Sequence, residues 1–403
     1  MYSKVSEEEI RAGDSDFKKN NRGSNIIVLI LGIILFSRFF QPYPIYNQSI
    51  LNHIYILLSQ IGTVYIVFRY ILRGKISKFF IFILMYYFIL LIATVWNGAN
   101  IRRLIMGMYP IIGMCCMIEI ESEKSYINLI RAFAWTLGSM ALINTFSAIL
   151  WRDGIEPEKY FAGVSNQLGL LYIFAIITII SYRRILGKRS KGIYLYFILS
   201  TLGLVLMDSA NNLVSWGMLI ILLVFENTRC GNKLVAFRRI IVIYTIIFIS
   251  IVIFRAQNLF SFFIEDILNK SLTLTNRTNI WDIVINQLKE QPLTGYGVQD
   301  SSNIIYLYLV RPNKPLVNST FSAHNQILQI LYEGGVLILV PLLLIIDRTN
   351  KNIRKYIGDR RIQPLIIGLF SILMVLMMES PGIDIFLILI CLISNFFRID
   401  EYI

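Results

Sequence analysis

Apolar runs of roughly 17 to 25 residues recur along the whole chain, with short polar loops between them. A helix of about 20 apolar residues is long enough to cross the hydrocarbon core of a bilayer. The composition agrees, because 56% of the 403 residues are hydrophobic and only 16% are charged, whereas a soluble domain is about 25% charged. The sequence therefore predicts an all-α, polytopic membrane protein built as one helix bundle.

We assign twelve spans to these runs, at residues 25–41, 49–68, 79–96, 104–119, 128–150, 164–182, 192–207, 213–226, 239–255, 324–346, 364–379 and 382–398. The chain then consists of a cytoplasmic N-terminal tail (1–24), nine spans (25–255), a large extracytoplasmic loop (256–323), three spans (324–398) and a cytoplasmic tail (399–403). The N-terminal tail is polar, so we expect no cleavable signal peptide and a first span that acts as a signal anchor.

Basic residues orient the bundle, because they gather in every second loop. The loops assigned to the cytoplasm contain Arg69, Arg73, Lys75 and Lys78; Lys124; Arg183, Arg184, Lys188, Arg189 and Lys191; Arg229, Lys233, Arg238 and Arg239; and Arg348, Lys351, Arg354, Lys355, Arg360 and Arg361. Cytoplasmic loops of membrane proteins carry an excess of Lys and Arg. The pattern therefore predicts a bacterial cytoplasmic membrane protein with both termini inside. The net charge of +13 has the same origin, so we expect no nucleic-acid partner.

The predicted loop 256–323 is the longest polar stretch between spans, and loops of this length are often functional. Its segments "NLFSFFIEDIL" and "TNIWDIVINQLKEQPLTGYG" place apolar residues at helical spacing. In the second segment, Ile280, Val284 and Leu288 form a stripe, and Pro292 breaks it. We expect one or two short helices on the outer surface of the bundle.

His324, one of only two histidines, lies where this loop enters the tenth predicted span. On a helix, Asn325, Gln329 and Tyr332 share one face, and a polar stripe is costly toward lipid, so we expect it to face the bundle interior or a cavity. Gly334 and Gly335 would let a neighbouring helix approach closely. His324 is then either part of a helix cap or a group that accepts a proton.

Three stretches resemble the O-antigen polymerase/ligase family, which comprises Wzy-like polymerases and related ligases. They are "NRTNIWDIVINQLKEQPLTGYG", "AHNQILQILYEGG" and, more weakly, "FAGVSNQLG". The family pattern has an arginine, a Trp or Leu four residues later and a Pro-Leu-x-Gly-x-Gly turn in its large external loop. A His-Asn pair and a later glycine follow in the next span. Here these positions are Arg277, Trp281, residues 292–297, His324-Asn325 and Gly335.

The resemblance implies metal-independent, inverting glycosyl transfer outside the membrane from a polyprenyl-diphosphate-linked saccharide, without a cofactor. His324 would be the general base and Arg277 would hold the diphosphate; Asn325, Trp281 and Asn166 are further candidates for substrate binding. The chemistry is consistent, because a neutral imidazole can accept a proton from a hydroxyl and a guanidinium presents a fork to phosphate oxygens.

The chain departs from the family pattern at Ser209-Ala210, where many members have Ser-Arg and use that arginine as a second diphosphate contact. Arg102 and Arg103 are the best substitutes, because they lie on the outward side against the charge pattern; lipid headgroup contacts are the alternative. The carboxylates Asp208, Glu379 and Asp384 near outward helix ends could bind sugar hydroxyls or cap helices. Glu333 falls on the helix face opposite His324, so we expect it not to assist His324 directly.

The first hypothesis for function is a polymerase that joins repeat units on undecaprenyl diphosphate, for an O-antigen, capsular or exopolysaccharide. A ligase that moves finished polysaccharide to another acceptor would use the same base and clamp. A flippase for lipid-linked units is a third class, but the chain has no self-similar halves and its polar residues concentrate on the outer side. The expected partners are the lipid-linked donor and acceptor and the bilayer, with a chain-length regulator and a flippase as further candidates.

Overall fold

The computed structural model describes residues 25–36, 41–152, 154–156, 159–187, 192–226, 228, 235–260, 277–299 and 322–401. These residues are almost entirely helical, which confirms the all-α prediction. The main helices are α2 (Ile26–Phe36), α3 (Tyr43–Asn47), α4 (Ser49–Leu72), α5 (Lys78–Trp96), α6 (Ile101–Leu150), α7 (Ser165–Ile185), α8 (Gly192–Leu206), α9 (Ala210–Phe225), α11 (Phe237–Phe248), α12 (Arg277–Glu290), α14 (Gln326–Gly334), α15 (Leu339–Ile353), α16 (Gln363–Met378) and α17 (Asp384–Ser394). Two short strands, β1 (Lys159–Tyr160) and β2 (Gly163–Val164), pair antiparallel.

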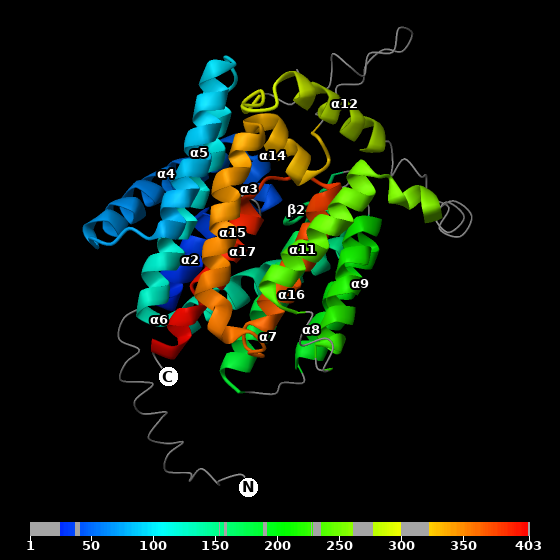
Figure 1. Ribbon diagram of the computed structural model, residues 1–403. Coiled ribbons are helices and arrows are strands. Elements are labelled where there is room, and N and C mark those ends of the chain that lie inside the picture. The colour runs from blue at the N-terminus through cyan, green and yellow to red at the C-terminus, as the bar shows by residue number, and fades with distance from the viewer. Residues whose placement is uncertain are drawn as a thin grey trace, which may run out of the picture.

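Most of the long helices form a bundle, and α12 lies across one end of it, next to α14 (Figure 1). The last helical turn, η7 (Phe396–Glu401), lies at the opposite end. The predicted helix over "TNIWDIVINQLKE" is therefore present as α12, and it ends at the predicted Pro-Gly turn. Of the other segment predicted to be helical in this loop (258–268), residues 258–260 lie in a short 3-10 turn, η3 (Ala256–Phe260), and residues 261–268 lie outside the described residues.

Among the described residues, four helices are long and apolar enough to cross a membrane, namely α4, α5, α6 and α7, and the bent pair α14 and α15 adds a fifth if it counts as one span. The same part of the chain contains four shorter apolar helices, α2, α8, α9 and α16, which coincide with other predicted spans. Apolar side chains are also exposed along α4, for example Ile50 and Val64, where a lipid bilayer would remove them from water. The protein is thus a membrane protein; the count of twelve spans stays a prediction.

α6 contains both the fourth and the fifth predicted span, with a break in helical geometry at Ser125 (φ −170°, ψ 102°). The Ser125 hydroxyl accepts a hydrogen bond from the Asn128 amide at 3.3 Å, as an N-cap does for a helix that starts there. Nearby, the buried Glu119 carboxylate accepts hydrogen bonds from Tyr70 and Ser77, both at 2.5 Å. This polar network fixes the position of the break relative to α4 and α5.

The tenth predicted span is not one straight helix, because α14 and the helical segment after it meet at an angle of 113°. The bend is at Gly335, whose φ of +61° is readily adopted by glycine alone. The turn at residues 292–297 packs against the bend: the Tyr296 amide donates to the Tyr332 carbonyl (2.8 Å), and the Val336 amide donates to the Pro292 carbonyl (2.8 Å). We expected a neighbouring helix to approach Gly334 and Gly335, but at Gly335 this turn approaches instead.

Gly335→Ala is expected to destabilise the protein. A Cβ at this position would lie 2.1 Å from the Leu293 carbonyl oxygen, and the backbone conformation alone costs a non-glycine residue about 1–3 kcal/mol. The matched control is Gly217→Ala in α9, where a Cβ would meet nothing within 4 Å. Thermal melting in detergent should show a lower midpoint for Gly335→Ala only; equal midpoints for both variants would contradict the importance of this close contact.

Candidate active site

His324 directly precedes α14, and its neighbour Asn325 fixes the start of that helix. The Asn325 side-chain oxygen accepts a hydrogen bond from the Leu328 amide (3.0 Å), as an N-cap does. Its side-chain nitrogen donates to the Met377 carbonyl near the end of α16 (2.9 Å). Asn325, a predicted substrate-binding residue, is fully buried, and both ends of its amide join α14 to α16. In this structure it therefore sets the position of His324.

The backbone of His324 is left-handed, with φ of 45°. Such a conformation is uncommon for residues other than glycine and costs about 1–3 kcal/mol unless the surroundings hold it. The imidazole is 31% exposed, and its Nδ1 lies 3.5 Å from Oε2 of Glu379. A carboxylate beside Nδ1 favours the tautomer with the proton on Nδ1, which leaves Nε2 free to accept a proton from a substrate.

Glu379 joins the two residues for which the resemblance implies a catalytic role. It follows α16 directly and is 5% exposed. Its Oε2 faces His324, and its Oε1 forms an ion pair with the Nη2 of Arg277, the first residue of α12. Three residues that are far apart in the sequence therefore form one group, which we call the His324–Glu379–Arg277 triad. The sequence indicated Glu379 only as a carboxylate at a helix end.

Arg277 is 18% exposed in its side chain, so part of the guanidinium can still reach a ligand. It also lies at the N-terminus of α12, where the helix dipole favours a negative charge. A guanidinium has five N–H donors, and only Nη2 is engaged by Glu379. Arg277 can therefore keep its ion pair and bind a phosphate oxygen at the same time.

Arg255 braces the start of α12, and the sequence reasoning missed it. Its guanidinium donates to the Thr278 carbonyl (3.1 Å), pairs with Asp282 and lies 5.3 Å from the centre of the Trp281 ring. Trp281, a predicted substrate-binding residue, is fully buried beneath it. One feature of the sequence could have identified Arg255. It ends the ninth predicted span on the outward side, where the positive-inside pattern predicts few cations.

A cavity of about 250 Å³ begins beside the triad. Ser322 and Ala323, which precede His324, and Ser380, which follows Glu379, line it. Gln329 and Tyr332 of the predicted polar stripe also line it, while Asn325, the third member of the stripe, is buried in the bundle interior against α16. Glu333 lies in this wall as well, where it accepts a hydrogen bond from Gln329 (2.8 Å).

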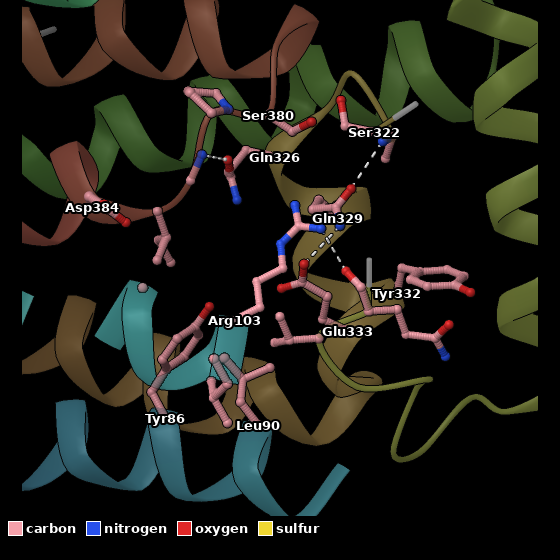
Figure 2. A pocket seen from close by; sticks show the side chains of 18 of the residues that line it. Tyr86, Leu90, Arg103, Ser322, Gln326, Gln329, Tyr332, Glu333, Ser380 and Asp384 are labelled. Carbon is pink, nitrogen blue, oxygen red and sulfur yellow. Dashed lines mark hydrogen bonds between the residues drawn. The ribbon is translucent and has the colours of Figure 1, made fainter. Parts of the chain in front are cut away.

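Arg103 extends from α6 into this cavity toward Glu333 and Gln329 (Figure 2). Its Nη1 donates to the Gln299 carbonyl at 2.8 Å. Arg102 is exposed and does not line the cavity. The two arginines that the sequence singled out together therefore have different surroundings, and Arg103 is the one that belongs to the wall of the cavity.

Asn166 lies in a second polar group at the start of α7. Its side-chain oxygen accepts a hydrogen bond from Ser209 (3.4 Å), at the place where the resemblance leads us to expect Ser-Arg. Two residues after Ser209, the Asn211 side chain donates to the carbonyl of Val375 (3.2 Å). Val375 lies in α16, one helical turn before Glu379. The "FAGVSNQLG" stretch and the chain around Ser209 thus meet, and Asn211 connects this group to the end of α16 that Glu379 follows.

The model of a protein family described as O-Antigen ligase (Wzy_C) matches residues 195–343. The matched segment contains Arg277 and His324 and ends before Glu379. No curated protein and no solved structure matches the chain. The family match confirms the resemblance that the motifs indicated.

Proposed function

From the O-antigen ligase pattern in residues 195–343 and the geometry of the triad, we propose that this protein is a membrane glycosyltransferase that polymerises saccharide units carried on polyprenyl diphosphate. The observation that carries the proposal is that one buried carboxylate, Glu379, contacts both His324 and Arg277. A base and a cation held together suit a reaction that removes a proton at one point and releases an anion at another.

In the proposed reaction, the acceptor hydroxyl oxygen attacks the anomeric carbon of the donor sugar. A new carbon–oxygen bond forms as the bond to the diphosphate oxygen breaks, and the electron pair of that bond leaves with the polyprenyl diphosphate. The hydroxyl proton moves to Nε2 of His324, and Glu379 stabilises the resulting imidazolium. Attack opposite the leaving group inverts the anomeric configuration.

Arg277 acts on the leaving group in this scheme. Negative charge develops on the diphosphate as the glycosidic bond breaks, so a fixed cation stabilises the transition state more than the ground state. The donor arrives already activated by its diphosphate, and the protein therefore needs to supply only positioning, a base and a cation. We place the reaction at the outer face of the bacterial cytoplasmic membrane.

Reconstitution with one substrate separates this function from its alternatives. The purified protein is placed in liposomes with a radiolabelled lipid-linked repeat unit from the producing strain. A polymerase yields a ladder of longer chains and releases one polyprenyl diphosphate per new linkage. A ligase yields no ladder and transfers the saccharide only when a different acceptor is added. Movement of the lipid across the bilayer without any new linkage would overturn the proposal in favour of a transporter.

Glu379→Gln is expected to lower the rate of chain growth. The amide can still accept a hydrogen bond from Arg277, but it no longer provides a negative charge to stabilise the imidazolium that forms at His324 in the proposed reaction. Glu379→Asp, which restores the charge, should recover part of the wild-type rate. The measurement is radiolabelled ladder formed per unit time by equal amounts of each variant in liposomes. Equal rates for Glu379→Gln and Glu379→Asp would show that the charge of Glu379 takes no part in the reaction.

A further inference from the structure

The cavity beside the triad is lined by none of the three triad residues, although residues adjacent to His324 and Glu379 line it. We propose that this cavity is the acceptor-sugar subsite, and that it takes an uncharged or amino-bearing sugar at the free end of the incoming repeat unit. This inference rests on the proposed function, because a transfer reaction needs a place for the sugar whose hydroxyl His324 deprotonates.

The lining has the groups that a sugar requires. The Gln326 side-chain oxygen accepts a hydrogen bond from the Gly382 amide (2.9 Å), and its side-chain nitrogen can donate to a sugar hydroxyl. Glu333 and Asp384 supply carboxylate oxygens. The hydroxyls of Tyr87 and Ser380 are buried and have no hydrogen-bond partner among the described residues, and both residues line the cavity. A buried polar group without a partner costs about 1–3 kcal/mol. A bound sugar hydroxyl would satisfy these groups.

The volume also points to a small occupant. At about 250 Å³, the cavity is slightly smaller than the roughly 300–1,000 Å³ of typical small-molecule sites. It can hold a terminal sugar but not a whole repeat unit or a growing chain. The rest of the saccharide would then extend out of the opening.

The charge of the lining distinguishes an acceptor sugar from a diphosphate. Among the described residues, the charged ones that line the cavity are Glu333, Asp384 and Arg103, which sum to a formal charge of −1. Arg103 is also engaged, since it donates to the Gln299 carbonyl and lies beside Glu333 (Figure 2). A diphosphate or a uronic acid would meet net repulsion here, whereas a neutral or amino sugar would not. The diphosphate belongs instead with Arg277, outside this cavity.

The lining also relates the cavity to the triad. Ala323 lines the cavity and is followed in the chain by His324, while Ser380 lines it and follows Glu379. Arg277 is the first residue of α12, and the residue of that helix in the lining is Val284, about two helical turns further on. The proposed acceptor sugar would therefore be bound by residues adjacent to His324 and Glu379, and not by residues adjacent to Arg277.

Protection of an introduced cysteine tests this assignment without relying on turnover. Ser322→Cys and Gln329→Cys each place a thiol in the lining, in a Cys230→Ser background; Cys115, Cys116 and Cys391 are buried. The probes are the lipid-linked repeat unit of the producing strain and the same polyprenyl diphosphate without sugar. At about ten times its Kd, the repeat unit should slow maleimide labelling roughly tenfold, because only the empty fraction reacts. The sugar-free lipid should leave the rate unchanged.

Leu293→Cys is the matched control, because Leu293 lies in the nearby turn, is 63% exposed and does not line the cavity. Its labelling should respond to neither probe. Equal protection of the cavity thiols by the sugar-free lipid, or no protection by either probe, would overturn the assignment. A repeat unit whose terminal sugar proves to be a uronic acid would overturn the charge argument.

The chain-growth assay of the wild-type protein keeps the two proposals apart. Ladders from the wild type together with unprotected cavity thiols would refute the acceptor subsite and leave the proposed function standing. Protected thiols without ladders would support a saccharide site and refute polymerisation.

Discussion

His324→Ala is expected to lower the rate of chain growth by about 10²–10⁴-fold, the contribution typical of a general base. Without the imidazole, the acceptor hydroxyl must lose its proton to water, and the transfer slows even though the donor and Arg277 are in place. The rate is measured as radiolabelled ladder formed per unit time by purified protein in liposomes. The buried Asn325 cap and its bond to Met377 stay intact, so the protein should accumulate normally in the membrane.

Two further variants separate the loss of the base from a loss of structure. His324→Asn suits the left-handed backbone at this position better than alanine does, because asparagine adopts that conformation more readily, yet it supplies no base. It should be as inactive as His324→Ala. His53→Ala removes the other histidine, an exposed residue whose Nδ1 contacts the Ser49 carbonyl, and should keep full activity. Wild-type ladders from His324→Asn would remove His324 from the chemistry.

Arg277→Ala is expected to slow chain growth by about 10²–10³-fold, as the loss of one preorganised electrostatic contact does in other enzymes. The release of polyprenyl diphosphate should fall in parallel with ladder formation, since both follow from the same bond cleavage. Arg277→Lys keeps the positive charge but cannot form the bidentate hydrogen bonds of a guanidinium, so it should have intermediate activity. Lys289→Ala, an exposed cation at the other end of the same helix, should have no effect.

Arg277→Ala also leaves the buried Glu379 without its cation, and an unpaired buried charge destabilises a protein. The double variant Arg277→Ala/Glu379→Gln removes that charge and should be at least as stable as Arg277→Ala in thermal melting, without regaining chain growth. If the double variant regained activity, Arg277 would serve only to neutralise Glu379, and the role of Arg277 at the diphosphate would be wrong.

The sequence predicted much of the fold and two of the three triad residues, for reasons that are local. Apolar runs of spanning length locate α4, α5 and α7 to within a few residues, because each helix is specified by its own segment. The stripe in "TNIWDIVINQLKE" predicted α12 in the same way. Arg277 and His324 were identified from the spacing of their motifs, and that spacing does not show that the two residues meet.

The rest depends on contacts that a one-dimensional pattern does not contain. The apolar pattern continues across Gly335 and therefore predicts one straight span. The bend between α14 and α15 depends on hydrogen bonds to the turn at residues 292–297, which the apolar pattern does not contain. Glu379 resembles any carboxylate at a helix end, and only the packing of α16 against α14 brings it to His324. Arg103 and Glu333 belong to different helices, and their common cavity is likewise a product of tertiary packing.

We propose that His324 and Arg277 meet at the outer surface of the membrane, and labelling of position 324 from each side shows whether they do. His324→Cys in the Cys230→Ser background is treated with a membrane-impermeant maleimide, on right-side-out spheroplasts and on inside-out vesicles. Ile357→Cys, an exposed position after η6 (Arg354–Tyr356) in a loop predicted to be cytoplasmic, is the opposite-side control. We expect labelling of position 324 in spheroplasts and of position 357 in inverted vesicles; labelling of position 324 only in inverted vesicles would place His324 on the cytoplasmic side and refute the proposed site.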